Sequence, residues 1–271
     1  MLLDKPEGRP LDFFDVLLLL WIVIAAVMLS VDALGEALGK GRYLVSELVI
    51  FIFGAAYLSA RRQNLPELFR WRRVPLKTLP GLVIAAISAA PLLDGFDRLI
   101  SLLIPLPAEY ALQLEKALTP TGTFDLLLVI AGVGIAAPLV EESIFRGAIQ
   151  QVLEKRRDIT SGVLLTALLF ALIHLQHWWF IQLLIMGVVL GYLAWSFNSL
   201  IPAILFHATN NLLSLYLTIH KNEVFDAYYL RDEQLSPYIA AGALALLIIG
   251  LYWAHQNREV KLPRADDDSS Q

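Results

Sequence analysis

The sequence places ionisable and amide side chains inside segments that are otherwise apolar. Charged groups are costly in hydrocarbon, so each of them marks a candidate functional site. Three of the apolar segments carry such groups: Glu141, Glu142 and Arg146 in the first of them, His174 at the end of the second, and His207 and Asn211 in the third. Carboxylates and imidazoles are the groups that proteins use for acid–base chemistry, so we expect a polar site between three helices.

The spacing within each segment assigns different tasks to these residues. Glu142 and Arg146 are four residues apart and share a helix face, which predicts an ion pair between them. Glu141 points about 100° away from that pair, so it is available to another helix. His207 and Asn211 are also four residues apart, which aims two hydrogen-bonding groups in one direction.

The depths of these groups along their helices are similar. The first two segments form an antiparallel hairpin that turns near Arg157, and Glu141 and His174 both stand roughly 25 Å from that turn. His207 and Asn211 reach a comparable depth. A buried glutamate beside a histidine can bind a water and take its proton, and donors opposite can stabilise an oxyanion. The pattern predicts hydrolysis of an amide bond by direct attack of water.

Other hydrolytic chemistries lack their residues. The chain has no cysteine, which excludes disulfides, a thiol nucleophile and thiolate metal sites. There is no HExxH zinc motif, no paired Gly-Asp motif and no serine-centred motif beside a histidine of matching depth. A zinc site remains an alternative, with Glu141, His174 and His207 as ligands and a fourth position for water.

The elements that must position these groups are membrane helices. The chain has 271 residues, of which 57% are hydrophobic and 17% charged, against about 25% charged in soluble domains. Since roughly 20 apolar residues span a bilayer, we predict an all-α, polytopic membrane protein with about eight transmembrane helices. They are expected near 13–31, 43–60, 78–93, 123–142 (continuing to about 155), 160–176, 178–197, 200–219 and 236–254.

The chain is expected to form one integral membrane domain, 1–271, with a motif-bearing core at about 123–219 and a disordered acidic tail at about 259–271. Lysine and arginine gather in 61–77, in 154–158 and in the tail, which predicts that both termini are cytoplasmic. Aromatic residues among the arginines of 61–77, Phe69 and Trp71, fit either an amphipathic segment on the membrane surface or a simple charge cluster. No basic domain for nucleic acid is present.

Three motifs in these segments resemble those of a known family. E-E-S-I-F-R at 141–146 is similar to an EExxxR motif, F-A-L-I-H at 170–174 to FxxxH, and H-A-T-N-N at 207–211 to HxxxN. Together and in this order they resemble the type II CAAX endopeptidase family. That family of CAAX proteases and bacteriocin-processing enzymes includes the Ras-converting prenyl protease.

The resemblance implies an intramembrane glutamate protease that needs no cofactor. By position in the motifs, Glu141 and His174 would activate water, and His207 and Asn211 would form the oxyanion site. Glu142, Arg146 and Phe170 would support them. The resemblance also implies that the active-site cavity opens toward the cytosol.

The expected partners are the lipid bilayer and a membrane-anchored peptide or protein substrate, cleaved near its anchored end. Prenylated CAAX proteins are the substrates of the eukaryotic branch of the family, whereas prokaryotic relatives differ. The short loops and the lack of a targeting extension favour a prokaryotic cell membrane.

Two further interpretations stay open beside a zinc-dependent hydrolase. A non-catalytic immunity or scaffold protein would use the same polar groups only for helix packing. A transporter could relay protons through a buried glutamate and histidine, but the sequence shows no repeat of the kind that many transporters contain.

Overall fold

The computed structural model describes residues 9–220 and 229–258, and these are folded almost entirely into helices. The N-terminal helices are α1 (Phe13–Val27), α2 (Gly35–Leu38), α3 (Arg42–Ala60), α4 (Leu65–Leu68), α5 (Leu79–Ser101) and α6 (Ala108–Leu118). A continuous helical rod follows, made of α7 (Thr123–Val129), η4 (Ile130–Ala136), α8 (Ala137–Glu142), η5 (Ser143–Ile149) and α9 (Gln150–Arg156). The later helices are α10 (Ile159–Ile173), α11 (Phe180–Ser196), α12 (Ile201–Ile219) and α14 (Pro237–Gln256).

Short helical turns and two short strands complete the fold. One π-helical turn, η1 (Met28–Ala33), extends α1, and two 3-10 turns, η2 (Gly39–Gly41) and η3 (Leu76–Thr78), precede α3 and α5. Two two-residue strands, β1 (Leu230–Arg231) and β2 (Gln234–Leu235), pair antiparallel just before α14. The predicted disordered tail, 259–271, lies outside the described residues.

Polar caps explain where two of the helices begin. The Asp12 carboxylate accepts hydrogen bonds from the backbone of Phe14 and Asp15, and the Asp15 carboxylate accepts one from the backbone of Asp12. This reciprocal arrangement satisfies donors at the start of α1 that have no partner within the helix. Asp158 likewise accepts a hydrogen bond from the Ser161 backbone and starts α10 directly after the basic turn.

The helices confirm the predicted fold class, an all-α polytopic membrane protein. Each of the eight predicted apolar segments coincides with a helix. Five helical stretches are long and apolar enough to cross a membrane, and α10 and α11 are shorter apolar helices. Large apolar side chains such as Trp21, Phe53 and Ile248 are more than half exposed on the outer helices, as expected where lipid covers the surface.

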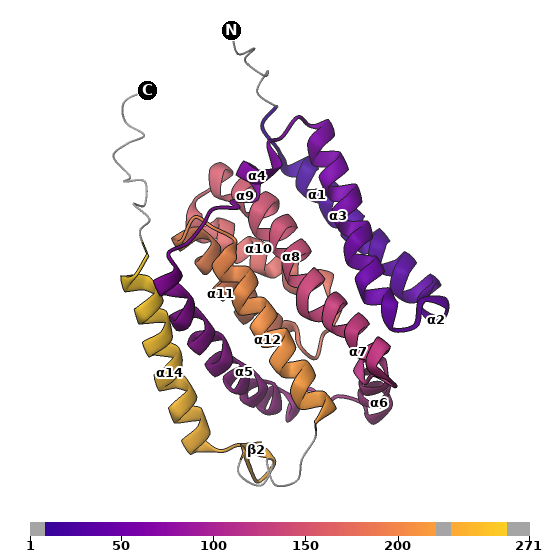
Figure 1. Cartoon of the computed structure of the whole chain (residues 1–271), viewed down its shortest axis with the longest axis vertical. Helices are drawn as coiled ribbons and strands as arrows, with labels where there is room; N and C mark the ends of the chain where they lie inside the picture. Colours follow the sequence, from indigo (N-terminus) through magenta and orange to yellow (C-terminus); the bar gives the residue numbers. More distant parts are fainter. Residues whose placement is uncertain (1–8, 221–228, 259–271) are drawn as a thin grey trace.

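The motif-bearing helices lie in the middle of the molecule. Figure 1 shows α8, α10, α11 and α12 at the centre, with α1 and α3 on one side and α14 on the other. α5 packs against both α12 and α14. At the α5–α14 crossing a Cβ atom on Gly81 would lie 2.6 Å from the Gly250 carbonyl oxygen, so glycine is needed for this approach. Both termini leave the same end of the bundle (Figure 1).

The segment 61–77 lies against that end, and its contacts bear on the two interpretations of its aromatic residues. Phe69 is only 4% exposed, and a Cβ atom on Gly147 would come within 2.8 Å of its ring. Arg70 forms an ion pair with Glu154. Trp71 alone of the two aromatic residues is exposed. An amphipathic membrane-surface segment that includes Phe69 is therefore wrong, because this aromatic ring packs into the protein core.

Candidate active site

The helical rod that carries Glu141 and Glu142 is irregular around them. π-helical segments, η4 and η5, lie on both sides of α8. Pro138, at the start of α8, has no backbone N–H to donate. π-helical turns inside α-helices are uncommon and occur frequently at functional sites.

Four side chains behind the site form a packed polar cluster: Glu142, Arg146, Gln150 and Glu154. Arg146 donates a 3.0 Å hydrogen bond to Glu142, and neither side chain of this ion pair is exposed. Gln150 donates a 2.7 Å hydrogen bond to Glu154 one turn further on. The predicted Glu142–Arg146 ion pair is thereby confirmed, and it belongs to a longer polar row along one helix face.

Backbone carbonyls of α11 also bind this cluster. Arg146 donates a hydrogen bond to the Gly187 carbonyl at 3.3 Å and Gln150 one to the Gly191 carbonyl at 3.1 Å. A Cβ atom on Gly187 would come within 2.9 Å of the Ala167 backbone of α10. The small residues of α11 therefore allow close helix packing and also leave backbone acceptors within reach of buried donors.

Phe170 links the packed polar cluster to the histidines. The Arg146 guanidinium lies 4.4 Å from the Phe170 ring centroid. On its other sides Phe170 packs against the rings of His174 and His207, at centroid distances of 4.6 and 6.1 Å. A cation over an aromatic face is attractive in a low-dielectric interior. The aromatic residue of FxxxH thus supports three of the motif residues at once.

His207 lies between the two adjacent glutamates. Its Nδ1 donates a hydrogen bond to Glu142 at 2.9 Å, and its Nε2 lies 4.0 Å from the Glu141 carboxylate. The ring is almost fully buried. The bond to Glu142 fixes the imidazole orientation, so that Nε2 faces Glu141. The sequence spacing did not predict this contact between the HxxxN and EExxxR motifs.

His174 is oriented by its own helix. Its Nδ1 lies 2.6 Å from the Phe170 carbonyl oxygen, one turn earlier. Because a carbonyl can only accept, Nδ1 carries the proton and Nε2 is left as an acceptor in the neutral ring. This geometry explains the four-residue spacing of FxxxH, and it suits His174 to binding a water molecule.

Asn211 contacts the irregular helix opposite. Its side-chain amide donates a 3.0 Å hydrogen bond to the Val133 carbonyl in η4. The amide nitrogen has a second N–H. Asn211 also lines the same cavity as Glu141 and His174.

A cavity of about 740 Å³ brings one face of all three motifs together. Its lining includes Glu141, Phe170, His174, His207 and Asn211, but neither Glu142 nor Arg146. Among the described residues, Glu141 Oε2 is buried without a hydrogen-bond partner. Within the same residues Glu142 Oε2 also lacks a partner, so the two adjacent glutamates differ in what they face: Glu141 lines the cavity, and Glu142 is held in the packed polar cluster.

Sequence reasoning missed one carboxylate of this cavity. Glu47, from α3, lines it and is only 8% exposed. Within the described part of the chain, its Oε2 also lacks a hydrogen-bond partner. Glu47 is a single charged residue within the apolar segment 43–60, and a charge at such a position was the available signal.

The far part of the cavity is lined by the end of α5 and by Tyr229. Asp94 accepts hydrogen bonds from Arg98 at 2.8 Å and from the Tyr229 hydroxyl at 3.0 Å. Asp97 accepts one from the Trp179 indole at 3.1 Å. Burial and then the Asp94 charge raise the pKa of the Tyr229 phenol, so Tyr229 remains a donor.

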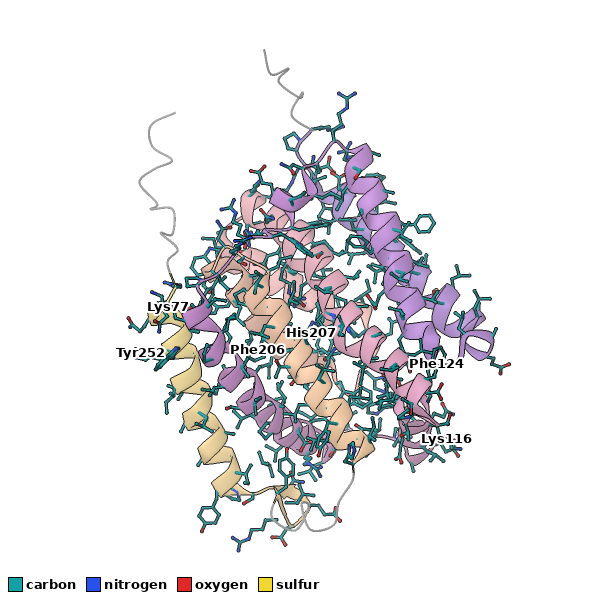
Figure 2. The ribbon with its side chains drawn as sticks, viewed as in Figure 1. Lys77, Lys116, Phe124, Phe206, His207 and Tyr252 are labelled. Carbon is teal, nitrogen blue, oxygen red and sulfur yellow. The ribbon has the colours of Figure 1, made fainter. Side chains whose placement is uncertain are left out.

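The cavity extends away from the end of the bundle that carries the termini. Its lining continues along α12 through Ser214 and Thr218 and reaches α6 at Leu114. α6 and the C-terminal end of α12 lie opposite the two termini (Figure 1). In Figure 2, His207 lies near the middle of the molecule, between Lys77 toward the terminal end and Lys116 at the opposite end. The cavity thus extends toward the end opposite the termini, whereas the sequence predicted that the termini and the active-site opening face the same side.

The described residues do not form the alternative zinc site. No group of three or more His, Cys, Asp or Glu side chains in 9–220 and 229–258 is arranged to hold a metal ion. The Nδ1 atom of His174 is hydrogen-bonded to the Phe170 carbonyl oxygen, and Nδ1 of His207 is hydrogen-bonded to the Glu142 carboxylate.

Comparison with known proteins agrees with the three motifs. No significant match was found among curated proteins or among solved structures. Residues 123–213 match the family Type II CAAX prenyl endopeptidase Rce1-like, and this range contains every motif residue named above. The resemblance drawn from the motifs is confirmed: this region, about a third of the chain, is similar to the intramembrane proteases of the type II CAAX prenyl endopeptidase family.

Proposed function

We propose that this protein is an intramembrane endopeptidase of the glutamate type. The observation that carries the proposal is the cavity, which gathers Glu141, His174, His207 and Asn211 from three helices. Of the two adjacent glutamates, Glu141 alone lines it. A carboxylate with an unused oxygen beside two imidazoles has the composition of a general-base site.

The proposed reaction begins with a water molecule held between Glu141 and the acceptor nitrogen of His174. Glu141 takes a proton from this water as the oxygen attacks the peptide carbonyl carbon. A tetrahedral intermediate with a negative oxygen forms. Glu141 then gives the proton to the amide nitrogen, the C–N bond breaks, and a carboxylic acid and an amine are released.

The second imidazole would stabilise the intermediate. His207 donates from Nδ1 to Glu142, so it can donate to an oxyanion only when Nε2 is protonated as well. Arg146 holds Glu142 in place, and Glu142 in turn fixes the orientation of this ring. Asn211 supplies its second amide hydrogen. One oxyanion donor of this kind typically contributes about 10²–10³-fold to turnover.

The substrate class follows from the setting of the site. The cavity lies within a membrane bundle, so we propose a membrane-anchored peptide or protein that is cleaved near its anchor. Prenylation of the substrate is the version that the related family suggests, and the probe for it is a farnesylated peptide. No cofactor is required in this mechanism.

The test is cleavage of a quenched fluorescent farnesylated CAAX peptide by purified protein. Wild type, Glu141→Ala and a cavity-lining control, Leu217→Ala, would be compared with and without a chelator, and a peptide without the prenyl group would be run in parallel. Cleavage by wild type and the control, but not by Glu141→Ala, supports the proposal.

Each other outcome has a defined meaning. Loss of activity with chelator that zinc restores would favour the metal-dependent hydrolase. Equal cleavage by wild type and Glu141→Ala would contradict the glutamate mechanism. No cleavage of several peptide sequences by any of the proteins would favour the immunity or scaffold interpretation.

A further inference from the structure

The charges of the two ends of the bundle differ. The connections at the end that carries the termini are rich in cations: Arg61, Arg62, Arg70, Arg72, Arg73 and Lys77 before α5, and Lys155, Arg156 and Arg157 between α9 and α10. At the opposite end, the described connections and α6 hold mainly acidic residues, with Lys40, Lys116 and Arg231 as the cations. Short loops rich in lysine and arginine stay in the cytoplasm. The end with the termini is therefore the cytoplasmic end.

The cavity extends toward the end of the bundle opposite the termini. Ser214 lies two helical turns beyond His207 on α12, roughly 10 Å further from the cytoplasmic end, and it is exposed within the cavity lining. The lining then continues to Leu114 of α6 and to His220.

On the cytoplasmic side of Glu141, the space between the helices is filled by side chains. Glu142, Phe145, Arg146 and Gln150 are each at most 1% exposed. Phe69, from the cationic connection, packs against the same helix at Gly147. Solvent and substrate therefore reach Glu141 from the end opposite the termini in this structure.

We infer that the active site takes its substrate from the extracytoplasmic side of the membrane. The substrate would then be the extracytoplasmic segment of a membrane-anchored polypeptide, next to its anchor, and not a tail presented from the cytosol. The identity of the cavity as an active site rests on the proposed function, whereas the side on which it opens does not.

The absence of cysteine from the chain makes the test direct. Three single-cysteine variants would report on three places: Ser214→Cys in the cavity, Glu109→Cys on exposed α6, and Thr160→Cys at the exposed start of α10 beside the basic turn. Each would be produced in a bacterial host and treated with a membrane-impermeant maleimide, first on intact spheroplasts and then on permeabilised ones. Labelling after denaturation would serve as the full-reaction reference.

We expect Glu109→Cys and Ser214→Cys to be labelled in intact spheroplasts, and Thr160→Cys only after permeabilisation. Labelling of Thr160→Cys but not Glu109→Cys from outside would show the reverse orientation and overturn the inference. The inference would also fail if Ser214→Cys reacted only after permeabilisation or only after denaturation.

Repeating the labelling in a Glu141→Ala background separates this inference from the proposed function. Accessibility needs no turnover, so the pattern should be unchanged in that variant. A protein that cleaves nothing could still show the expected labelling, and an active protease could still show the reverse.

Discussion

Two polar regions share the long helical rod, and they differ in what their side chains contact. In the packed polar cluster, Arg146 binds Glu142, an aromatic face and a backbone carbonyl, and solvent is excluded. In the cavity, Glu141 has open space in front of it. His207 contacts both regions. Adjacent residues of one type can thus serve structure and chemistry, and the partners of each decide which.

The largest effect is expected from the histidine on the cavity side. His174→Ala should lower kcat by about 10²–10⁴-fold, because the water loses a positioning acceptor, while the melting temperature in detergent stays close to that of wild type. The matched control is His177→Ala. His177 packs against Trp178 at a ring-centroid distance of 3.6 Å and does not line the cavity.

Glu141 and His174 can be tested for joint action. If Glu141 and His174 activate one water, the Glu141→Ala/His174→Ala double variant should be no slower than the worse single variant. Losses that multiply would mean that the two residues act in separate steps.

The opposite behaviour is expected in the packed polar cluster. Arg146→Ala leaves Glu142 charged and buried, which typically costs about 3–5 kcal/mol, so it should lower the melting temperature strongly whether or not substrate is present. Arg146→Met combined with Glu142→Gln removes both charges and should recover much of that stability. Unchanged melting of Arg146→Ala would contradict the structural role of the ion pair.

A smaller loss is expected from the close helix contact behind the cluster. Gly187→Ala places a Cβ atom within 2.9 Å of the Ala167 backbone, and overpacking of this kind costs about 1–3 kcal/mol. The control is Gly242→Ala on α14, where a Cβ atom would meet nothing within 4 Å. That substitution should be neutral or slightly stabilising. Similar melting temperatures for the two variants would count against the close packing of α10 on α11.

The smallest effect should come from the carboxylate that sequence reasoning missed. Glu47→Gln keeps the size of a cavity side chain. Within the described residues Glu47 forms no hydrogen bond to either imidazole, so we expect kcat to change by less than about tenfold, below the usual effect of a general base. A loss as large as that of Glu141→Ala would make Glu47 an equal candidate for the base.

Much of the site could be predicted because helix periodicity is regular. The four-residue spacings of Glu142 with Arg146 and of Phe170 with His174 correspond to contacts in the structure. The hydrogen bond from His207 to Glu142 could not be predicted, since it depends on how α12 is rotated against α8. The burial of Phe69 could not be predicted for a related reason: a local pattern of aromatic and basic residues does not reveal that a glycine on another helix leaves room for the ring.

The direction of the cavity was beyond the sequence as well. The depth of a residue along its helix can be counted from a turn. The end at which a cavity opens cannot, because both ends of the helices carry polar residues. Which end is filled depends on side chains from many helices, including the segment 61–77 that packs over the rod.

The bonds from Arg146 and Gln150 to backbone carbonyls of α11 also affect how the protein can vary in evolution. A carbonyl is supplied by every residue type, so the acceptors at 187 and 191 cannot be lost by substitution. What a substitution does is add a side chain at these glycines, and that side chain would prevent the close approach of the helices. Tolerance at these two positions should therefore be set by side-chain volume, with little dependence on polarity. A saturation library would show this as a ranking by size.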